Sequence, residues 1–516
     1  MLLHQLLENA AANRPDRPVL VGRDFSLTYG ALNHRANRCA GLMRRRGLKP
    51  GDRVVIALEN GVDMVTAYFG AMKAGGVAVP LPPGPRSDRL PAVIADCAPH
   101  ITILDEATAQ AFVPRGILDP VPHVLTTTTP TPDLRVENFA AACEDCAETP
   151  LDHRGDPADL AAIIYTSGST GEPRGVMLSH GNFVANAESI VEYLGLTADD
   201  KVMCVLPFSY VYGLSLLHTH VAVGGSIVIE NRVAFPNVVL DAMAGHGVTG
   251  FAGVPSTFAL MLHRSSLDEV RLPKLRYVTQ AGGAMSSAKI DDWLRRGPPA
   301  EFYVMYGATE AAARLSYLPP RDLVSKRGSI GRPIPGVELR VLSEEGEEAG
   351  SGQLGELVAR GPNIARGYWN RPQETAERFG PEGYRTGDLG YADADGYFYI
   401  VGRRHDMIKV GANRVGAREI EDVLHLHPSV HEAAVVAVPH DLLGEAPVAI
   451  VSLTGTISGV DPELRAFCAA HLAAYKVPVR VMVVTELPKL ASSGKLDRVA
   501  LRRLAVGADD VTGHVS

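Results

Sequence analysis

The stretch YTSGSTGEPRG at residues 165–175 lies between two apolar segments, AAIIYT and GVMLSH, that have the pattern of buried strands. A helical pattern follows the second segment. Every side chain in residues 166–171 is small, hydroxylated or absent. A Gly/Ser/Thr loop that leaves a strand directs backbone N–H groups at an anion, and Arg174 adds a charge-assisted contact. The loop lacks the GxxxxGK[ST] pattern of a Walker loop. The stretch predicts a phosphate-binding loop, and the alternative is a flexible linker.

Strand-like and helix-like segments alternate around this loop and through most of the chain, as in DRVVIALEN, GVDMVTAYFGAMKAGG and VAVPL. Such alternation indicates parallel sheets linked by crossover helices. From about residue 337 the pattern changes to short strands with Gly-rich turns, and after residue 402 a strand–helix pattern begins. We predict an α/β fold with a large N-terminal lobe of parallel-rich sheets and a small β element over residues 1–402. A small α+β lobe is expected over residues 403–516.

Composition excludes several classes of protein. The 516 residues are too many for one ordinary core, which agrees with two lobes. The net charge is −8, from 50 Lys and Arg against 58 Asp and Glu, and argues against nucleic acid as the main partner. No apolar run reaches about 18 residues, so no membrane span is expected. The N-terminal segment lacks the pattern of a signal peptide, which predicts a cytoplasmic location.

Cysteine usage gives no sign of a disulfide scaffold or a metal centre. Cys143 and Cys146 form a single CxxC among acidic residues, with no second pair of ligands after it. A surface coincidence is favoured over a redox or zinc site.

The stretch YTSGSTGEPRGVMLSH resembles the phosphate-loop signature of the adenylate-forming superfamily: acyl-CoA synthetases, adenylation domains of peptide synthetases and luciferases. The usual pattern is [YF]TSG[ST]TGxPKG. This chain has Arg174 at the usual lysine, and the two cations differ in geometry, which puts the detailed role of this position in question. The resemblance implies that Arg174 is catalytic and that the loop binds ATP through Thr166, Ser167, Gly168, Ser169, Thr170 and Gly171.

Further motifs follow in the family's order, so the resemblance covers the chain from end to end. They are QAGGAMS at 280–286, YGATE at 306–310, GRPIPG from 331, YRTGDLG at 384–390, GRRHDMIKVGANRVGAREIE at 402–421 and LPKLASSGKLDR at 487–498. The resemblance implies that ATP or AMP is also bound by Gly282, Gly283, Ala284, Tyr306, Gly307, Asp388 and Arg403.

The resemblance implies a two-step reaction in which a carboxylate attacks the α-phosphate of ATP and a thiol then displaces AMP. The first step brings two anions together, so catalysis rests on positioning and charge neutralisation. Thr309 is expected to bond the α-phosphate, Glu310 to bind Mg²⁺, and Lys495 to stabilise the charge that develops. Asp388 is expected to accept both ribose hydroxyls, with Arg403 reinforcing that contact.

Each of these residues has an ordinary alternative. Glu310 could serve a helix dipole, Asp388 could form a turn, and Lys495 could be a solvated lysine. Their occurrence in an ordered series favours the functional interpretation.

The resemblance also implies that the small C-terminal lobe is mobile and rotates about a hinge. The family usually has Asp or Lys at the hinge, whereas this chain has His405. Because histidine titrates near neutrality, we hypothesise that rotation depends on pH. The hypothesis fails if His405→Lys leaves the pH profile of the second step unchanged.

The acid pocket is expected to draw on FSYVYGLS at 208–215, GVPSTF at 253–258, QAGG and Tyr306. Peptide-synthetase domains for α-amino acids usually have Asp in the first stretch, where this chain has Val211. A buried ammonium without a partner is costly, so an aliphatic or aryl acid is favoured over a standard α-amino acid. The alternative is that the aromatic residues belong to the core. The predicted pocket residues are Tyr210, Val211, Tyr212, Gly213, Val254, Phe258 and Gly282.

CoA and a phosphopantetheinylated carrier protein present the same thiol arm, and CoA is favoured as the acceptor. One alternative is a ligase that passes the acyl group to an amine. Another, outside enzymes, is a regulatory paralogue that binds nucleotide without turnover. The intact Glu310, Asp388 and Lys495 argue against that last alternative.

Overall fold

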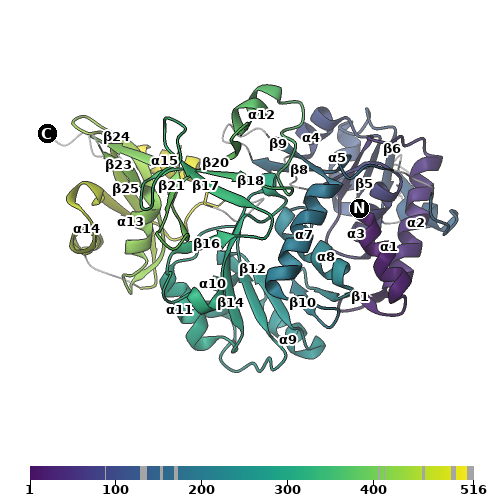
Figure 1. Ribbon diagram of the computed structural model, residues 1–516, viewed down its shortest axis with the longest axis horizontal. Helices are drawn as coiled ribbons and strands as arrows, with labels where there is room; N and C mark the ends of the chain where they lie inside the picture. The colour runs from purple at the N-terminus through teal and green to yellow at the C-terminus, as the bar shows by residue number, and fades with distance from the viewer. Residues whose placement is uncertain are drawn as a thin grey trace.

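The computed structural model describes residues 1–85, 87, 89–127, 136–151, 155–167, 173–404, 407–411, 413–455, 459–489 and 496–507. Within these residues the strands form three sheets (Figure 1). Six predicted site residues lie outside the described residues: Gly168, Ser169, Thr170, Gly171, His405 and Lys495.

The first sheet carries the phosphate loop and has the strand order β7-β6-β5-β3-β4-β8-β9. Its neighbouring strands are parallel except β8 and β9. The central strands are apolar on both faces, as expected for a parallel sheet covered by helices. The strands are β3 (Arg53–Ala57), β4 (Val77–Leu81), β5 (Ile101–Leu104), β6 (His123–Thr126), β7 (Glu137–Asn138), β8 (Leu160–Ser167) and β9 (Pro173–Ser179). The helices of this region are α2 (Tyr29–Arg45), α3 (Val62–Lys73), α4 (Leu90–Cys97), α5 (Glu106–Phe112) and α6 (Phe139–Glu144).

The second sheet holds the other motifs of the large lobe. Its parallel part has the order β14-β13-β12-β10-β11-β1, and β2 completes that edge. These strands are β1 (Pro18–Val21), β2 (Ser26–Thr28), β10 (Lys201–Cys204), β11 (Ser226–Ile229), β12 (Gly250–Gly253), β13 (Tyr277–Gln280) and β14 (Glu301–Tyr306). The associated helices are α1 (His4–Asn13), α7 (His180–Leu194), α8 (Val211–Val223), α9 (Pro236–His246), α10 (Pro255–Arg264) and α11 (Ser287–Arg296).

The predicted β element continues the second sheet. Strands β15 and β16 join β14 to β21, and the order then runs β21-β20-β18-β17, with β19 paired to β20. These strands are β15 (Ser316–Leu318), β16 (Ser329–Pro333), β17 (Glu338–Leu342), β18 (Gly355–Arg360), β19 (Phe379–Gly380), β20 (Gly383–Ala392) and β21 (Phe398–Arg403). Helix α12 (Pro372–Arg378) lies before β19. The continuity brings the end of β14 close to β20 and β21, which carry two of the later motifs.

Helix α8 is the most buried helix near the site. Almost every residue from its first turn to Val221 is buried, and the helix packs against α7, α1, β10 and β11. The helix is mostly apolar, and its few polar side chains, including Ser215 and His220, form hydrogen bonds inside the core, so it needs no face toward water. Its first turn contains Val211 and Tyr212, so the core fixes the position of these predicted pocket residues.

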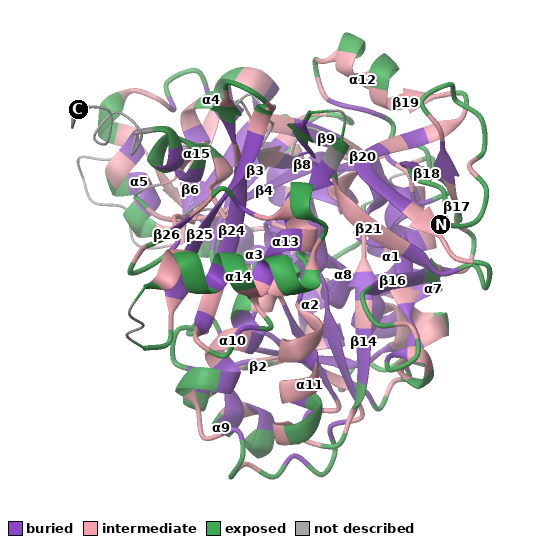
Figure 2. Ribbon diagram, turned by 90° about the vertical axis from the view of Figure 1, so that its left-hand side faces the viewer, coloured by how far each residue is buried: buried purple, intermediate pink, exposed green. Residues whose placement is uncertain are grey.

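The C-terminal lobe is a separate α+β unit, as predicted. Its sheet has the order β23-β22-β25-β24, with β26 paired to β25. Figure 2 shows β24 and β25 as buried strands, whereas α14 has an exposed outer face. The elements are β22 (Met407–Val410), β23 (Asn413–Gly416), β24 (Val430–His440), β25 (Gly444–Leu453), β26 (Arg480–Val483), α13 (Ala417–Leu424), α14 (Val460–His471) and α15 (Arg498–Gly507).

The two lobes meet in sequence between β21 and β22, and Figure 1 places the C-terminal lobe at one end of the molecule. The predicted α/β fold, with a large N-terminal lobe and a smaller C-terminal lobe, is confirmed. Among the described helices, none has the length and apolarity needed to cross a membrane.

Candidate active site

Three predicted residues from three distant motifs meet at Asp388. Tyr306, at the end of β14, donates its hydroxyl hydrogen to Asp388 Oδ2 at 2.5 Å. Arg403, the last residue of β21, donates from Nε to Asp388 Oδ1 at 3.2 Å. The carboxylate is therefore held at both oxygens, and the Asp388 N–H, which donates to Thr386 Oγ1 at 3.1 Å, fixes the backbone. The arrangement presents a fixed acceptor suited to a pair of hydroxyl groups.

The electrostatics of this cluster keep the Tyr306 phenol protonated. Asp388 is 7% exposed, whereas the Arg403 side chain is 67% exposed. Burial, and then the negative charge of Asp388, hold the pKa of Tyr306 well above its ordinary value, so the phenol stays a donor. Because Arg403 is exposed, solvent weakens its ion pair with Asp388. The partly buried Tyr306 therefore orients Asp388 more firmly than the exposed Arg403 does.

A second carboxylate supports the strand segment that carries Asp388. Glu356, on β18, accepts from Arg385 Nη1 at 2.9 Å and from the Gly387 N–H at 3.1 Å. Arg404 Nη1 lies 3.6 Å from the same carboxylate. Glu356 was not predicted, because nothing in its local sequence distinguishes it from an ordinary strand residue.

Glu310 and Thr309 lie in a short 3₁₀ turn, Thr309–Ala311, that follows β14, and both are half-buried. The Tyr368 hydroxyl donates to Glu310 Oε1 at 2.8 Å. The Ala365 N–H donates to the Glu310 carbonyl at 2.8 Å, which fixes the backbone of the turn. Burial and the Glu310 charge raise the pKa of Tyr368, so it too remains a donor. The carboxylate is thus oriented by a tyrosine that the motifs did not indicate.

The donor set around Glu310 is compatible with magnesium. Among the described residues, no group of three or more His, Cys, Asp or Glu side chains gathers as a metal site. Magnesium commonly takes one or two protein carboxylates and completes its shell with water and phosphate oxygens. Glu310 supplies such a carboxylate, so the residues present fit the ion.

Arg174 connects the base of the phosphate loop to this region. It lies on β9 opposite Thr166 of β8, one position before Ser167 and Pro173, the last pair of the two strands. Arg174 Nε lies 2.6 Å from Glu374 Oε2 of α12, and the guanidinium carbon lies 5.5 Å from the centre of the Tyr368 ring. Figure 1 shows α12 beside β8 and β9. The cation therefore sits between the loop and the tyrosine that orients Glu310.

The predicted adenine segment is an open loop between β13 and α11. Gly282, Gly283 and Ala284 are exposed, and the Gln280 side-chain amide donates to the Gly283 carbonyl at 2.8 Å. Gly282 has φ +81°, a conformation that favours glycine. At Gly307, an added Cβ would lie 1.9 Å from the Ala313 carbonyl oxygen, so the backbones pack too closely for a side chain.

Most of the predicted acid-pocket residues lie together near the start of α8 and the adenine loop, and one lies in the core. Tyr210 is the residue before α8, and Val211, Tyr212 and Gly213 form its buried first turn. The Tyr212 hydroxyl contacts the Thr279 carbonyl oxygen and Oγ1, each at 3.0 Å, which ties α8 to β13. Val254 lies directly beneath Gly282, 3.0 Å from the position of an added Cβ. These residues bring α8, β13 and the adenine loop together.

Phe258 lies elsewhere, on α10 in the aromatic core. Its ring centre is 4.9 Å from that of Trp293, 5.5 Å from Phe302 and 5.9 Å from Phe251, and the side chain is fully buried. This position favours the alternative that Phe258 is a core residue.

Comparisons with known proteins agree with this geometry. The family model described as AMP-binding enzyme matches residues 7–369, and the AMP-binding enzyme C-terminal domain matches residues 419–495. The chain belongs to the AMP-binding enzyme family. It is 34% identical over 97% of its length to a sulfoacetate–CoA ligase from Cupriavidus necator, of which it also covers 97%. It is 31% identical over 96% of its length to an oxalate–CoA ligase from Arabidopsis thaliana, covering 97% of that protein.

The fold of the chain is also similar to the folds of solved CoA ligases. An anthranilate CoA ligase in complex with anthranoyl-AMP has a TM-score of 0.91, at 26% identity over 99% of this chain and 98% of that chain. An o-succinylbenzoate CoA synthetase from Bacillus subtilis, bound to ATP and a magnesium ion, has a TM-score of 0.84 at 27% identity, covering 96% and 98% of the two chains. The predicted superfamily and enzyme class, an AMP-forming acid–thiol ligase, are therefore confirmed.

Within this member of the AMP-binding enzyme family, Arg314 is the functional candidate that the sequence prediction missed. The residue is 2% exposed, and its guanidinium carbon lies 4.4 Å from the centre of the Tyr212 ring. Its Nε donates to Met305 Sδ at 3.1 Å and its Nη1 donates to the Ala313 carbonyl at 3.1 Å. The only local signal is a single cation in the apolar segment AAAR that follows YGATE.

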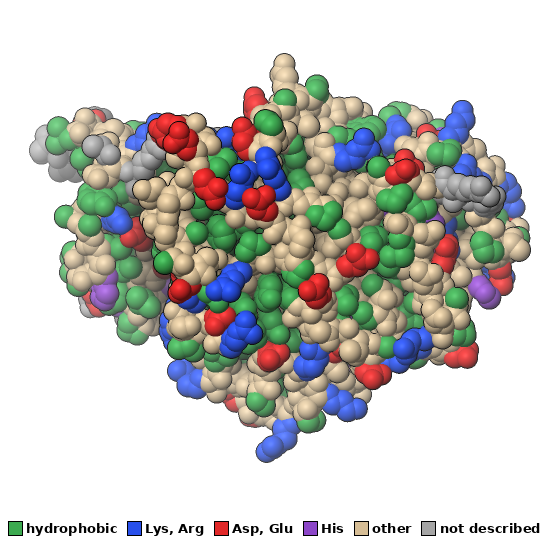
Figure 3. Space-filling view, in the orientation of Figure 1, with side chains coloured by type: hydrophobic (Ala, Val, Ile, Leu, Met, Phe, Trp, Pro, Cys, Tyr) green, Lys and Arg blue, Asp and Glu red, His purple; other side chains and the backbone are tan. Residues whose placement is uncertain are grey.

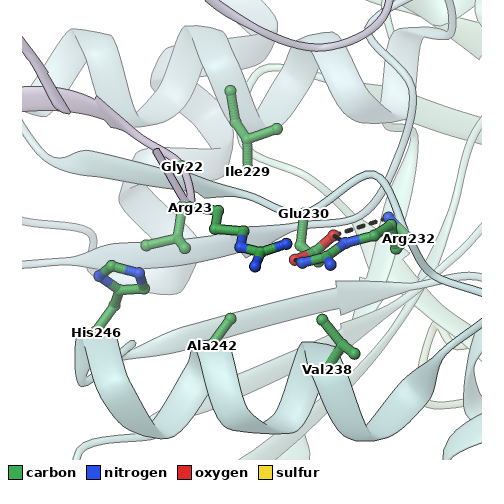
Figure 4. A pocket seen from close by; sticks show the side chains of 9 residues that line it. Gly22, Arg23, Ile229, Glu230, Arg232, Val238, Ala242 and His246 are labelled. Carbon is green, nitrogen blue, oxygen red and sulfur yellow. Dashed lines mark hydrogen bonds and ion pairs between the residues drawn. The ribbon is translucent and has the colours of Figure 1, made fainter. Parts of the chain in front are cut away.

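A surface hollow lies elsewhere on the large lobe and contains none of the predicted site residues. It has a volume of about 380 Å³ between the β1–β2 turn, β11 and α9 (Figure 4). Its charges are largely matched, since Arg232 pairs with Glu230 at 2.7 Å and Arg23 lies 4.0 Å from Asp24. Figure 3 likewise shows positive and negative side chains interspersed over the face in view. The hollow is therefore separate from the candidate active site, which is formed by the side chains around Asp388 and Glu310.

Proposed function

We propose that this protein activates a carboxylic acid with ATP and transfers the acyl group to CoA. In the first step, a carboxylate oxygen attacks the α-phosphorus, and the bond to the β-phosphate breaks to release pyrophosphate. In the second step, the thiol sulfur attacks the acyl carbon, and AMP leaves. The observation that carries the proposal is the meeting of Tyr306, Asp388 and Arg403 in a chain of the AMP-binding enzyme family.

Binding of the nucleotide is proposed to use groups that already have fixed directions. Asp388 accepts from the ribose hydroxyls, and Arg403 stays close enough to reinforce that contact. Adenine lies along the exposed segment Gly282, Gly283 and Ala284, beside Tyr306 and Gly307. The loop residues 166–171 donate to the β- and γ-phosphates, as backbone N–H groups of such loops do.

Catalysis is proposed to come from positioned charge, because both reactants are anions and the acid needs no base at neutral pH. Thr309 bonds the α-phosphate, and Arg174 stabilises the phosphates from the base of the loop. Lys495 neutralises charge between the acid and the α-phosphate. Glu310 would hold magnesium, which supplies charge neutralisation at the phosphate oxygens when bound.

The two steps are proposed to use different positions of the C-terminal lobe. The N-terminal AMP-binding and acid-binding domain spans residues 1–402, and residues 403–516 form the mobile domain that brings Lys495 to the site. His405 is proposed as the hinge. The end of β21 at Arg403 supports a hinge here, because the next strand, β22, belongs to the sheet of the C-terminal lobe.

The experiment is acid-dependent release of pyrophosphate by the full-length protein, across short, medium-chain, long-chain, aryl and amino acids. Release is expected with one class of acid. It should fall about 100- to 1000-fold in Lys495→Ala, the usual cost of removing one stabilising donor from the reacting centre. A protein whose melting temperature rises with ATP, but which releases no pyrophosphate with any acid, would contradict the proposal.

The acceptor is tested on the same acid by supplying CoA, a phosphopantetheinylated carrier protein or an amine. The CoA ligases among the similar proteins support CoA as the acceptor. Thioester formation on the carrier protein alone would instead assign the chain to carrier loading.

A further inference from the structure

Arg314 is a buried cation at the wall of the predicted acid pocket. It follows the turn that carries Thr309 and Glu310, and its guanidinium packs over the Tyr212 ring in the first turn of α8. The polar contacts of its side chain are with neutral groups: the Met305 thioether, the Ala313 carbonyl and the Tyr193 hydroxyl. The guanidinium carries five N–H groups, so N–H groups remain for another acceptor.

No Asp or Glu among the described residues lies within ion-pair distance of Arg314. Two arginines of the same lobe that are less buried than Arg314 do have a carboxylate partner. Arg276 Nη2 lies 3.0 Å from Asp200 Oδ2, and Arg385 Nη1 lies 2.9 Å from Glu356 Oε2. A buried charge that lacks an opposite charge is destabilising, and a cation–π contact with one ring offsets only part of that cost. Such a residue is poorly explained as a stabilising part of the core.

The surroundings of Arg314 connect it to the reacting end of the site. Tyr212, beneath the guanidinium, bonds to Thr279 on β13, the residue before Gln280, which holds the adenine loop. The Ala313 carbonyl, which Arg314 contacts, packs against the backbone of Gly307. The cation therefore lies where α8, β13 and the end of β14 converge, and these are the elements that line the predicted acid pocket.

We propose that Arg314 binds a second anionic group on the acid substrate. This rests on the proposed function and narrows it: the substrate is an acid that carries a carboxylate or sulfonate besides the carboxylate that is activated. A planar guanidinium suits this task because it donates two parallel hydrogen bonds to the oxygens of one anionic group. The substrate's charge then supplies the counter-ion that the described residues do not.

The test uses acids in matched pairs that differ in the second anionic group: succinate and butyrate, sulfoacetate and propionate, and phthalate and benzoate. Pyrophosphate release by the wild-type protein is expected to favour the dianionic member of at least one pair by tenfold or more in kcat/KM. Arg314→Met should lower kcat/KM for that acid by about 100-fold or more, since truncating one partner of a buried ion pair is strongly unfavourable. Its activity with the monoanionic member should stay the same or rise.

Two further variants separate recognition from folding. Arg314→Lys keeps the charge but not the planar fork, so its loss with the dianionic acid should be smaller than that of Arg314→Met. Arg232→Met removes an arginine of the surface hollow and should leave the ranking of acids unchanged. The melting temperature and the affinity for ATP of each variant report whether it folds. The preference of the wild-type protein among the acids tests the inference even if a variant fails to fold.

The outcomes distinguish this inference from the proposed function. If wild type releases pyrophosphate but prefers the monoanionic acid in every pair, the inference is wrong and the proposed function stands. If Arg314→Met folds, binds ATP and slows both members of a pair equally, Arg314 has a structural role and the inference is also wrong. If no acid in any pair or class supports release, the proposed function fails and the inference fails with it.

Discussion

The nucleotide end and the acid end of the site differ in whether their charged side chains have partners within the protein. At the nucleotide end, Asp388 and Glu310 are each oriented by a tyrosine hydroxyl, and Arg174 pairs with Glu374. At the acid end, Arg314 is buried against Tyr212 with no carboxylate partner among the described residues. A site with its own counter-ions suits a ligand that every member of the family shares. A cation that relies on the ligand for its counter-ion suits selection among acids.

Among the variants that test the oriented groups of the nucleotide end, the largest effect is expected at Asp388. Asp388→Asn removes the charged acceptor for the ribose hydroxyls and the partner of Arg403, and hydrogen bonds to charged groups contribute about 1.5–3 kcal/mol. The kcat/KM for ATP should fall about 10- to 100-fold, by the same factor with every acid. Steady-state kinetics with two acids measures it, with Asp395→Asn as the exposed control. A change in the ranking of acids would contradict the separation of the two ends.

A smaller effect is expected on the acid side from Tyr212→Phe. The change removes the hydroxyl contacts with Thr279 but leaves the ring beneath Arg314. The KM for the acid should rise about 2- to 10-fold, the value of one neutral hydrogen bond, and the KM for ATP should stay constant. Initial rates over a grid of both substrates measure this, with Tyr303→Phe as the control. An effect confined to ATP would show that Tyr212 serves the nucleotide end instead.

Tyr368→Phe tests whether the tyrosine matters for orienting Glu310. Losing one donor to the carboxylate should lower the apparent affinity for magnesium about 3-fold or more at fixed ATP, with little change in the preference among acids. A magnesium titration of pyrophosphate release measures the shift. Tyr397→Phe removes a similar tyrosine–carboxylate contact, with Asp322, away from the site. If wild type, Tyr368→Phe and Tyr397→Phe depend equally on magnesium, Tyr368 does not orient Glu310 for metal binding.

The smallest effect is expected from Arg174→Lys, which restores the residue usual in the resembling motif. Lysine keeps the positive charge near Glu374 and the Tyr368 ring, so the ion pair persists and kcat should change less than about threefold. Arg174→Gln, which removes the charge, should cost more. Single-turnover release of pyrophosphate compares the three proteins. If lysine is as harmful as glutamine, the planar guanidinium itself is required at this position.

The sequence predicted the alternating strands and helices because burial imposes a regular period on apolar residues, and it predicted the motif residues that meet at Asp388. It could not predict Tyr368 or Glu374 as partners of Glu310 and Arg174, because these contacts join segments that only the tertiary fold brings together. Arg314 belongs to no motif, and it became a candidate only because it is buried with no carboxylate partner among the described residues. The acid-pocket prediction included Phe258 because a pattern of aromatic residues does not distinguish a pocket wall from the core.

The stoichiometry of products from ATP, CoA and a productive acid decides whether the protein activates the acid as an adenylate. AMP, pyrophosphate and acyl-CoA thioester are expected in equal amounts, with pyrophosphate still released in a single turnover when CoA is left out. Formation of ADP and phosphate, or ATP binding with no AMP formed under any acid, would contradict activation as an adenylate.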